Sequence, residues 1–234
     1  MREDITSIPV SEVFEPRDGC PICRLRDTLE QRCVTYIMGA AMMEPDIRIE
    51  TNKLGFCASH FEMMLHQKNR LSLALMLESH LKHLRETHYK EITAYASAKP
   101  RKRAGMTTVN DTCFVCDQIA RVMDTMLSTV VHQWEKDPEF QALFAEQPCV
   151  CLPHAQLLLQ AGQDHLSKKS RPAFEKQVLA LLDQAILAVQ EDVSHFCRMF
   201  DYRNASANAD WGNSRDSIER AILLLATRDF REQS

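Results

Sequence analysis

The sequence GCPICR at residues 19–24 holds two cysteines three positions apart, Cys20 and Cys23. A pair with the same spacing occurs again in CFVC, at Cys113 and Cys116. A CxxC pair can form a thiol redox site, supply half of a metal site, or have no chemical role. The residues that follow each pair help to distinguish among these three interpretations.

Each CxxC pair is followed at a similar distance by a CxxH element. The first pair is separated by 33 residues from Cys57 and His60 in CASH, and the second by 34 residues from Cys151 and His154 in CLPH. A lone CxxC is a weak signal, but two copies with nearly identical separations are hard to obtain by chance. The spacing therefore predicts an internal repeat.

The segments between these elements also match. An offset of 93 places four residues of the first copy on four apolar residues of the second: Ile22, Leu29, Cys33 and Ile37 on Val115, Val122, Met126 and Val130. Apolar residues at this spacing predict one amphipathic helix in each copy. Pro45 and Pro138 fall on equivalent positions, where we expect that helix to stop because proline cannot continue it. A long helical pattern follows each CxxH element.

Composition favours helices throughout. The 234 residues include only six glycines and nine prolines, and Leu, Met, Ala, Glu, Gln and Lys outnumber β-branched residues, as is typical of helical proteins. We predict an all-α fold of two tandem helical repeats, each nucleated by a Cys₃His metal site, plus a C-terminal helix. Ser214 is a suitable N-cap for that last helix, over residues 214–231.

The expected organisation follows the repeat. Residues 1–97 form the first unit, 98–110 a basic linker, 111–204 the second unit, and 205–234 a loop and helix that pack on the repeats. One compact domain overall is expected. The sequence shows neither a signal peptide nor an apolar run long enough to span a membrane, so we expect a cytoplasmic protein whose thiols stay reduced.

The cysteines and histidines of the two repeats are predicted to bind zinc. Zinc prefers four tetrahedral ligands, and a CxxC with a CxxH supplies three thiolates and one imidazole. We assign one ion to Cys20, Cys23, Cys57 and His60, and another to Cys113, Cys116, Cys151 and His154. Three alternatives stay open: an iron–sulfur cluster, a thioredoxin-like redox site at the CPIC sequence, and small buried residues without a metal.

The remaining cysteines and histidines have simpler interpretations. Cys33 and Cys197 are expected to be core thiols, and the repeat favours Cys151 over Cys149 as the ligand. His80, His83 and His88 could form a further metal site, but their equivalents in the second copy are apolar, so a solvated or interfacial helix face is favoured.

Charged and aromatic residues are interpreted in the same way. Arg24, Arg26 and Arg32 are expected on a charged helix face, the basic residues 99–103 in a solvated linker, and Trp211 as a packing anchor. The net charge of −4 makes nucleic acid an improbable partner.

Positive evidence for catalysis is weak. The sequence contains no glycine-rich phosphate loop, no HExxH and no nucleophile elbow. Closed zinc sites and long helices favour a non-catalytic interaction or adaptor module with a protein partner. An iron–sulfur or thiol redox protein is the alternative, and an enzyme with a site between the repeats near residues 201–213 is a weaker one. The sequence does not define an oligomeric state.

Four sequence elements resemble one protein family: CPICR, LGFCASH, NRLSLALMLE, and FDYRN followed by WGN. Together they are similar to DUF6062, a family of uncharacterised bacterial proteins, over nearly the whole chain. The resemblance implies the duplicated cysteine and histidine pattern but no particular activity. Six residues separate FDYRN from WGN, more than is typical of the family.

Overall fold

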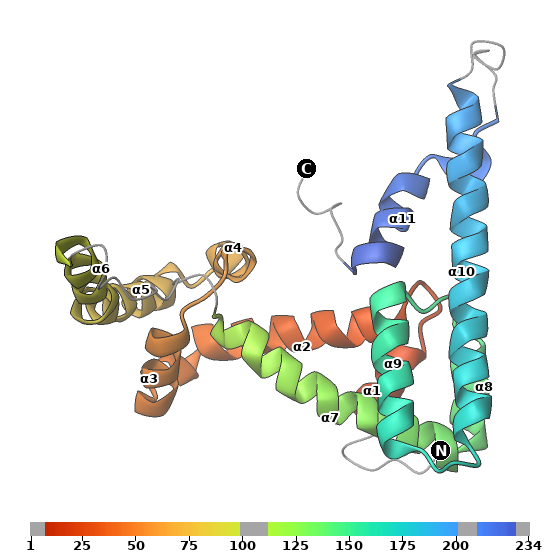
Figure 1. Cartoon of the computed structure of the whole chain (residues 1–234), viewed down its shortest axis with the longest axis horizontal. Helices are drawn as coiled ribbons and strands as arrows, with labels where there is room; N and C mark the ends of the chain where they lie inside the picture. The colour runs from red at the N-terminus through yellow and green to blue at the C-terminus, as the bar shows by residue number, and fades with distance from the viewer. Residues whose placement is uncertain (1–7, 99–111, 201–209, 228–234) are drawn as a thin grey trace. The chain divides into compact units, whose positions relative to one another are not determined.

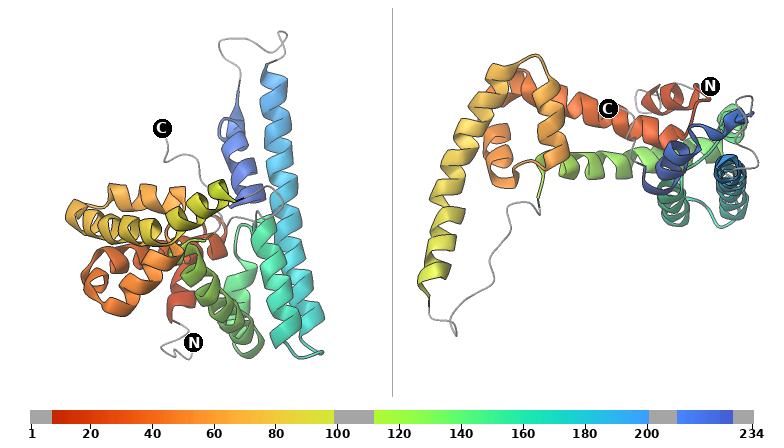
Figure 2. Two further views of the ribbon diagram at one scale, coloured as in Figure 1. Left: turned by 60° about the vertical axis from the view of Figure 1, so that its left-hand side comes forward. Right: turned by 90° about the horizontal axis from the view of Figure 1, so that it is seen from above.

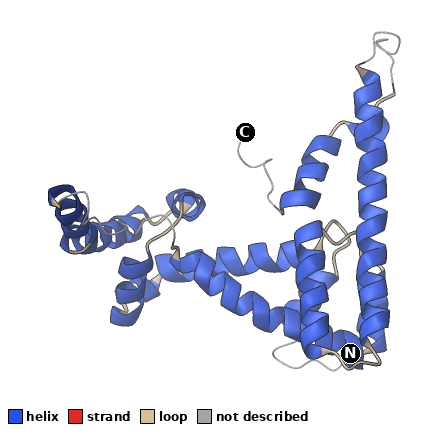
Figure 3. Cartoon of the chain, in the orientation of Figure 1, coloured by secondary structure: helices blue, strands red, loops and turns tan. Residues whose placement is uncertain are grey.

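The structure is a computed structural model that describes residues 8–98, 112–200 and 210–227. Every element in these ranges is helical, and none of them contains a strand (Figure 3). The predicted all-α class is therefore confirmed. None of the described helices combines the length and apolar character needed to cross a membrane.

The first half of the chain contributes six α-helices and a 3₁₀ turn. They are α1 (Ile8–Phe14), α2 (Pro21–Met38), η1 (Ala40–Met43), α3 (Pro45–Leu54), α4 (Ala58–His66), α5 (Arg70–Glu86) and α6 (His88–Ser97). The second half contributes α7 (Phe114–Lys136), α8 (Pro138–Ala145), α9 (Leu152–His165), α10 (Arg171–Met199), η3 (Gly212–Ser214) and α11 (Ser217–Ala226) (Figure 1).

Matching sequence elements occupy matching places in the helices. The two CxxC pairs lie at the starts of α2 and α7, and Pro45 and Pro138 are the first residues of α3 and α8. The aligned apolar residues also share their burial: Ile22 and Val115 are fully buried, as are Ile37 and Val130. These agreements support the repeat, which remains an interpretation of the sequence.

The long helix expected in the first copy is divided in two. Thr87 separates α5 from α6 with φ −115° and ψ −84°, and its hydroxyl donates a 2.8 Å hydrogen bond to the His83 carbonyl. Such bonds from a threonine back to the preceding turn compete with the helical pattern. In the second copy α10 is continuous over 29 residues.

The last helix is shorter than predicted. Ser214 is not its N-cap, because Ser214 closes the 3₁₀ turn η3 and Asp216 precedes α11. Thr227 ends α11 in the left-handed conformation, with φ 58°. The remainder of the predicted helix, 228–231, lies outside the described residues.

Contacts divide the chain into two compact units, and this division cuts across the repeats. One unit is a single stretch, residues 27–123, and the other combines residues 1–26 with 124–234. The unit of residues 1–26 and 124–234 has an aromatic core in which Phe144 stacks on Phe14 and contacts Phe174, while Trp134 packs edge-on against Phe174. In the same unit, α9 and α11 both pack on α10 (Figure 2).

The unit of residues 27–123 has a core of aliphatic and sulfur-containing side chains. Val34, Ile37 and Met64 have no solvent exposure, and α3 packs along α5. The turn between α3 and α4 depends on Gly55, which has φ 62°. A Cβ atom there would lie 3.1 Å from the His80 ring, so only glycine fits this turn without strain.

Trp211 packs against other aromatic rings, as a packing anchor should. Its ring centroid lies 5.7 Å from that of Phe196 and 5.8 Å from that of Phe200. Nearby, Arg220 in α11 forms a 2.9 Å ion pair with Asp192 in α10. Aromatic packing and an ion pair thus hold the segment from Trp211 through α11 against α10.

Candidate metal centres

The eight predicted ligands lie in two groups of four, but each group combines the two repeats. The outer group consists of Cys20, Cys23, Cys151 and His154, and the inner group of Cys57, His60, Cys113 and Cys116. The expected pairing of each CxxC with the CxxH of its own repeat was therefore wrong. Each CxxC instead meets the CxxH of the other repeat. The four ligand atoms of each group lie within 4.8 Å of one another.

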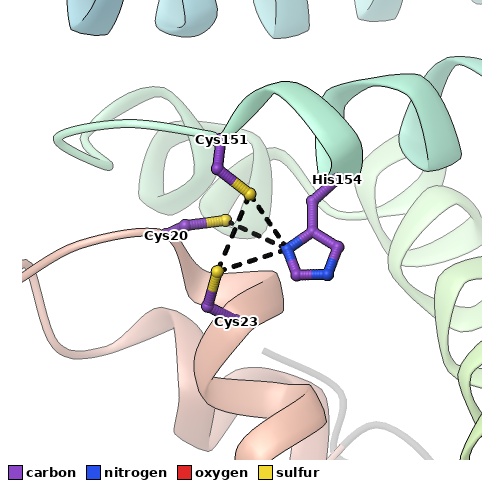
Figure 4. Close-up of side chains that lie close together, drawn as sticks. All are labelled: Cys20, Cys23, Cys151 and His154. Atoms are coloured by element: carbon purple, nitrogen blue, oxygen red, sulfur yellow. Dashed lines mark hydrogen bonds between the residues drawn. The ribbon is translucent and has the colours of Figure 1, made fainter. Parts of the chain in front are cut away.

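The outer group is closed and buried. The Nδ1 atom of His154 lies 3.7 Å from the Cys20 sulfur, 3.3 Å from the Cys23 sulfur and 3.1 Å from the Cys151 sulfur. The Cys23 and Cys151 sulfurs are 3.7 Å apart. Figure 4 shows the three sulfurs and this nitrogen converging from α2 and from the start of α9. All four residues are buried.

The inner group has the same arrangement with more solvent around it. The Nδ1 atom of His60 lies 3.1 Å from the sulfurs of Cys57 and Cys113 and 3.5 Å from that of Cys116. The Cys57 and Cys116 sulfurs are 3.9 Å apart. His60 and Cys113 are buried, Cys57 is half-buried, and Cys116 is exposed.

Two hydrogen bonds explain why the inner group combines residues of both repeats. The Phe114 amide, at the start of α7, donates to the Gly55 carbonyl at 2.9 Å. The Thr112 hydroxyl donates to the Leu54 carbonyl at 2.8 Å. These bonds hold the chain on both sides of Cys113 against the α3–α4 turn, next to Cys57.

Arg24 holds together the segments that carry the outer group, a role that the sequence did not predict. Its guanidinium donates to the Val13 and Pro16 carbonyls at 2.9 and 2.8 Å, to Asp18 at 2.7 Å, and to the Gln147 amide oxygen at 3.0 Å. The interpretation of Arg24 as part of a charged surface was wrong. Its side chain joins the start of α2 to the segment that leads into Cys151.

Each of the four chelating pairs lies at the N-terminus of a helix. Cys57 and Cys151 are the N-caps of α4 and α9, and the histidine of each pair follows in the first turn. A helix N-terminus favours negative charge, because unpaired amides and the helix dipole point toward it. The fold therefore brings two helix N-termini to each group of thiols, which stabilises the thiolate form that binds metal.

The distances are close to those around a single tetrahedral metal ion, for which zinc provides the reference geometry. With Zn–S bonds of ~2.3 Å and Zn–N bonds of ~2.05 Å, tetrahedral geometry places sulfurs about 3.8 Å apart and each sulfur about 3.6 Å from the nitrogen. The Cys23 and Cys151 sulfurs are 3.7 Å apart, and the Cys57 and Cys116 sulfurs 3.9 Å. The S–N distances range from 3.1 to 3.7 Å. Either group could thus hold one ion.

Without an ion, the thiols of each group compete for protons. In the inner group, burial raises the pKa of Cys113, but His60 and nearby backbone amides outweigh burial and lower it to about 6. Burial and the neighbouring Cys113 thiolate raise the pKa of Cys116 to about 12. In the outer group, contacts with Cys151 and Cys23 lower the pKa of Cys20. One thiolate in each group thus keeps a neighbouring thiol protonated, and a bound cation would replace that proton.

Glu30 orients the histidine of the inner group. Its carboxylate lies 2.7 Å from His60 Nε2, on the side of the ring opposite the sulfurs. An acidic partner on the outer nitrogen fixes the ring and makes the inner nitrogen a better metal ligand. Burial lowers the pKa of His60, but Cys113 and Glu30 more than compensate and raise it to about 10.

The remaining cysteines lie outside both groups. Cys149 does not belong to either, as the repeat predicted, and burial raises its pKa to about 11. Cys33 is half-buried. Cys197 is exposed on α10, so its prediction as a core thiol was wrong.

His80, His83 and His88 form no further group with metal-ligand spacing among the described residues. His80 is buried under Gly55, and its Nδ1 lies 3.0 Å from the Asn52 carbonyl. Of the two expected environments it therefore has the interfacial one, between α5 and α3. His83 and His88 are half-buried, and His88 faces Glu91. The basic residues 99–103 and the polar residues 201–204 lie outside the described residues.

A family model covers almost all of the chain. The matching family is described as a family of unknown function, DUF6062, and the match extends over residues 1–232. The chain belongs to this family. The DUF6062 chain is also 20% identical, over 191 residues, to a protein of Caldicellulosiruptor sp. (strain Rt8B.4), described as an uncharacterised 23.9 kDa protein in the xynA 3′ region. That alignment covers 82% of this chain and 87% of the relative. No solved structure matches.

Replacing Arg24 should destabilise the protein. Arg24→Ala removes a charged donor from four acceptors, so we expect a loss of about 2–4 kcal/mol in the free energy of unfolding. Arg24→Lys should recover only part of it, because an ammonium cannot span the same acceptors. Arg121→Ala is the matched control, since its ion pair with Asp117 is exposed, and should cost at most about 0.5 kcal/mol. Denaturant unfolding followed by circular dichroism measures all three; equal losses for Arg24→Ala and Arg121→Ala would contradict the role of Arg24.

Proposed function

We propose that this DUF6062 chain is a zinc-stabilised helical protein in which each Cys₃His group holds one Zn²⁺ ion. The observation that carries the proposal is the spacing of the ligand atoms, which matches a tetrahedral site in both groups. Three thiolates and one imidazole are a ligand set that zinc prefers. The helix N-termini and the carboxylate of Glu30 support it further, since they favour thiolates and a correctly oriented histidine.

An iron–sulfur cluster is the alternative for the same residues. In a four-iron cluster each ligand binds a different iron atom, so the ligands lie farther apart than around a single ion. All four ligand atoms of each group lie within 4.8 Å of one another. This separation favours one ion over a cluster.

The ions are proposed to be structural. A zinc ion with four protein ligands has no open position for water or substrate, whereas a catalytic zinc keeps one. Both groups supply four ligands. Metal binding to such sites is worth about 10–16 kcal/mol in apparent terms, comparable with the net stability of a domain of about 5–15 kcal/mol.

The finer part of the proposal is an interaction role with another protein. Several large apolar side chains of α5 and α6 are exposed, including Leu81 at 62%, Tyr89 at 60% and Ile92 at 50%. Exposed apolar residues that gather on helices are typical of surfaces that bind other proteins. The net charge of −4 does not favour nucleic acid.

Metal content and colour test the proposal directly. Elemental analysis of protein purified without oxygen should give about two zinc ions per chain, and the visible spectrum should be featureless. A brown or red solution that contains iron would support the alternative. A stable, folded chain that contains no metal would overturn both.

Paired ligand substitutions test the exchanged grouping. Cys57→Ser with Cys113→Ser removes two ligands from the inner group alone, so one zinc per chain should remain tightly bound. Cys20→Ser with Cys57→Ser removes one ligand from each group, so both ions should bind more weakly. Competition with a chromogenic chelator measures both results. If each ion were held within one repeat, the two double variants would give the opposite results.

Site-specific photo-crosslinking tests the interaction role. A photoreactive amino acid at Leu81 should form a covalent adduct with another protein in cells. The same amino acid at Lys82 is the control, because this neighbouring residue is also exposed but points about 100° away around the helix. Adducts that are the same at both positions, or absent at Leu81, would contradict an interaction role for the exposed apolar side chains of α5 and α6.

A further inference from the structure

The two groups differ in how exposed their cysteine residues are. In the outer group, Cys23 is 9% exposed and Cys151 is 2% exposed. The residues at the equivalent positions of the inner group are Cys116, which is exposed, and Cys57, which is half-buried. The same ligand set is therefore sealed in one group and open on one side in the other.

This difference matters because a metal-bound sulfur is still a nucleophile. A bound zinc ion keeps cysteine in the thiolate form, and oxidation by small molecules follows thiolate character and exposure. Burial protects the outer thiolates from such reagents. Cys116 is only partly shielded, because it is an exposed residue.

We propose that Cys116 is an oxidation site through which a hydroperoxide releases the metal ion of the inner group while the outer group keeps its own. This inference rests on the proposed function, since it requires zinc in both groups. The reactant is a small hydroperoxide, with hydrogen peroxide as the simplest member of the class.

The first step forms a sulfenic acid. The Cys116 thiolate attacks one oxygen of the peroxide, an S–O bond forms, the O–O bond breaks, and hydroxide leaves. Sulfur is oxidised by two electrons and the peroxide is reduced by two. The sulfur then carries a hydroxyl group and is a poor zinc ligand.

The second step forms a disulfide with a neighbouring thiolate. The Cys57 sulfur lies 3.9 Å from the Cys116 sulfur, and Cys113 belongs to the same group within the 4.8 Å limit. Attack by one of these thiolates forms the S–S bond, breaks the S–O bond and releases a second hydroxide. Two protons from solvent convert both hydroxides to water. Only His60 and one thiolate then remain as ligands, so the ion leaves.

An exposed cysteine outside both groups would add thiol oxidation that is unrelated to the metal sites. Cys197 is exposed and belongs to neither group, so it reacts with peroxide without affecting a metal. Cys197→Ser is therefore included in every protein tested. Any thiol lost together with zinc then comes from the ligands or from Cys33 and Cys149, which peptide mapping distinguishes.

The experiment treats the zinc-loaded full chain with hydrogen peroxide and follows released zinc with a chromogenic chelator. We expect a fast phase that releases one zinc per chain and consumes two thiols. Mass spectrometry should find a disulfide from Cys116 to Cys57 or Cys113, with Cys20, Cys23 and Cys151 unmodified. A dithiol reductant with added zinc should restore the second ion.

Two histidine substitutions at equivalent positions provide the matched comparison. Cys116→His keeps four ligands in the inner group but removes the exposed thiolate, so the fast phase should slow by about tenfold or more. Cys23→His makes the same change in the outer group and should leave the fast phase intact. If Cys116→His does not retain its ion, the protein with all eight ligand residues intact is treated with peroxide and dimedone, which traps sulfenic acids. The inference then requires that Cys116 is the first residue labelled.

The outcomes separate this inference from the proposed function. Zinc that leaves both groups at one rate, or first oxidation at Cys20, Cys23 or Cys151, overturns the inference and leaves the zinc sites in place. A chain that contains no zinc before peroxide is added overturns the proposed function, and the inference with it.

Discussion

The hydrogen bond from the Phe114 amide to the Gly55 carbonyl, at 2.9 Å, holds together the segments whose cysteines meet in the inner group. It places the start of α7 at the turn before α4, so that CFVC faces CASH. The turn itself requires a positive φ of 62° at Gly55, with the His80 ring packed beneath. In the other compact unit, GCPICR and CLPH form the second group. Arg24 and Gln147 hold that second group from the side.

Three thiols and a histidine at these distances are unfavourable as a group of free charges. The pKa of Cys113 lies near 6 and that of Cys116 near 12, which shows how strongly neighbouring sulfurs oppose each other's ionisation. Helix N-termini offset part of this repulsion, and a divalent cation would offset most of it. In each group, two chelating pairs thus converge on a position where a positive charge would be stabilised.

The sequence predicted the helical class, the eight residues that the two groups contain, and the helix starts at the CxxC pairs and at Pro45 and Pro138, because these depend on local spacing and on proline positions. It did not predict the exchange between the repeats. The separations of CxxC from CxxH are compatible with pairing inside a repeat, and the contacts that decide otherwise involve backbone groups of Gly55, Phe114 and Leu54, which leave no pattern in the residue types.

The other errors have the same origin in tertiary contacts. Arg24 was expected on a charged helix face, but the fold surrounds its guanidinium with four acceptors. For His80 the pattern left a solvated and an interfacial face open, and packing beneath Gly55 decides between them. Cys197 was assigned to a buried face by periodicity, but α10 leaves that position exposed. In each case the neighbours, and not the local pattern, set the environment of the side chain.

The nesting of the two groups has a consequence for biosynthesis. His60 and Cys113 are 53 positions apart, whereas Cys23 and Cys151 are 128 positions apart and enclose the entire inner group. A ribosome therefore delivers all four inner ligands before it has made Cys151 or His154. Cys20 and Cys23, although synthesised first, must wait for their partners until most of the chain exists. The nascent protein can assemble its inner centre first, and translation of the later helices is needed to close the outer one.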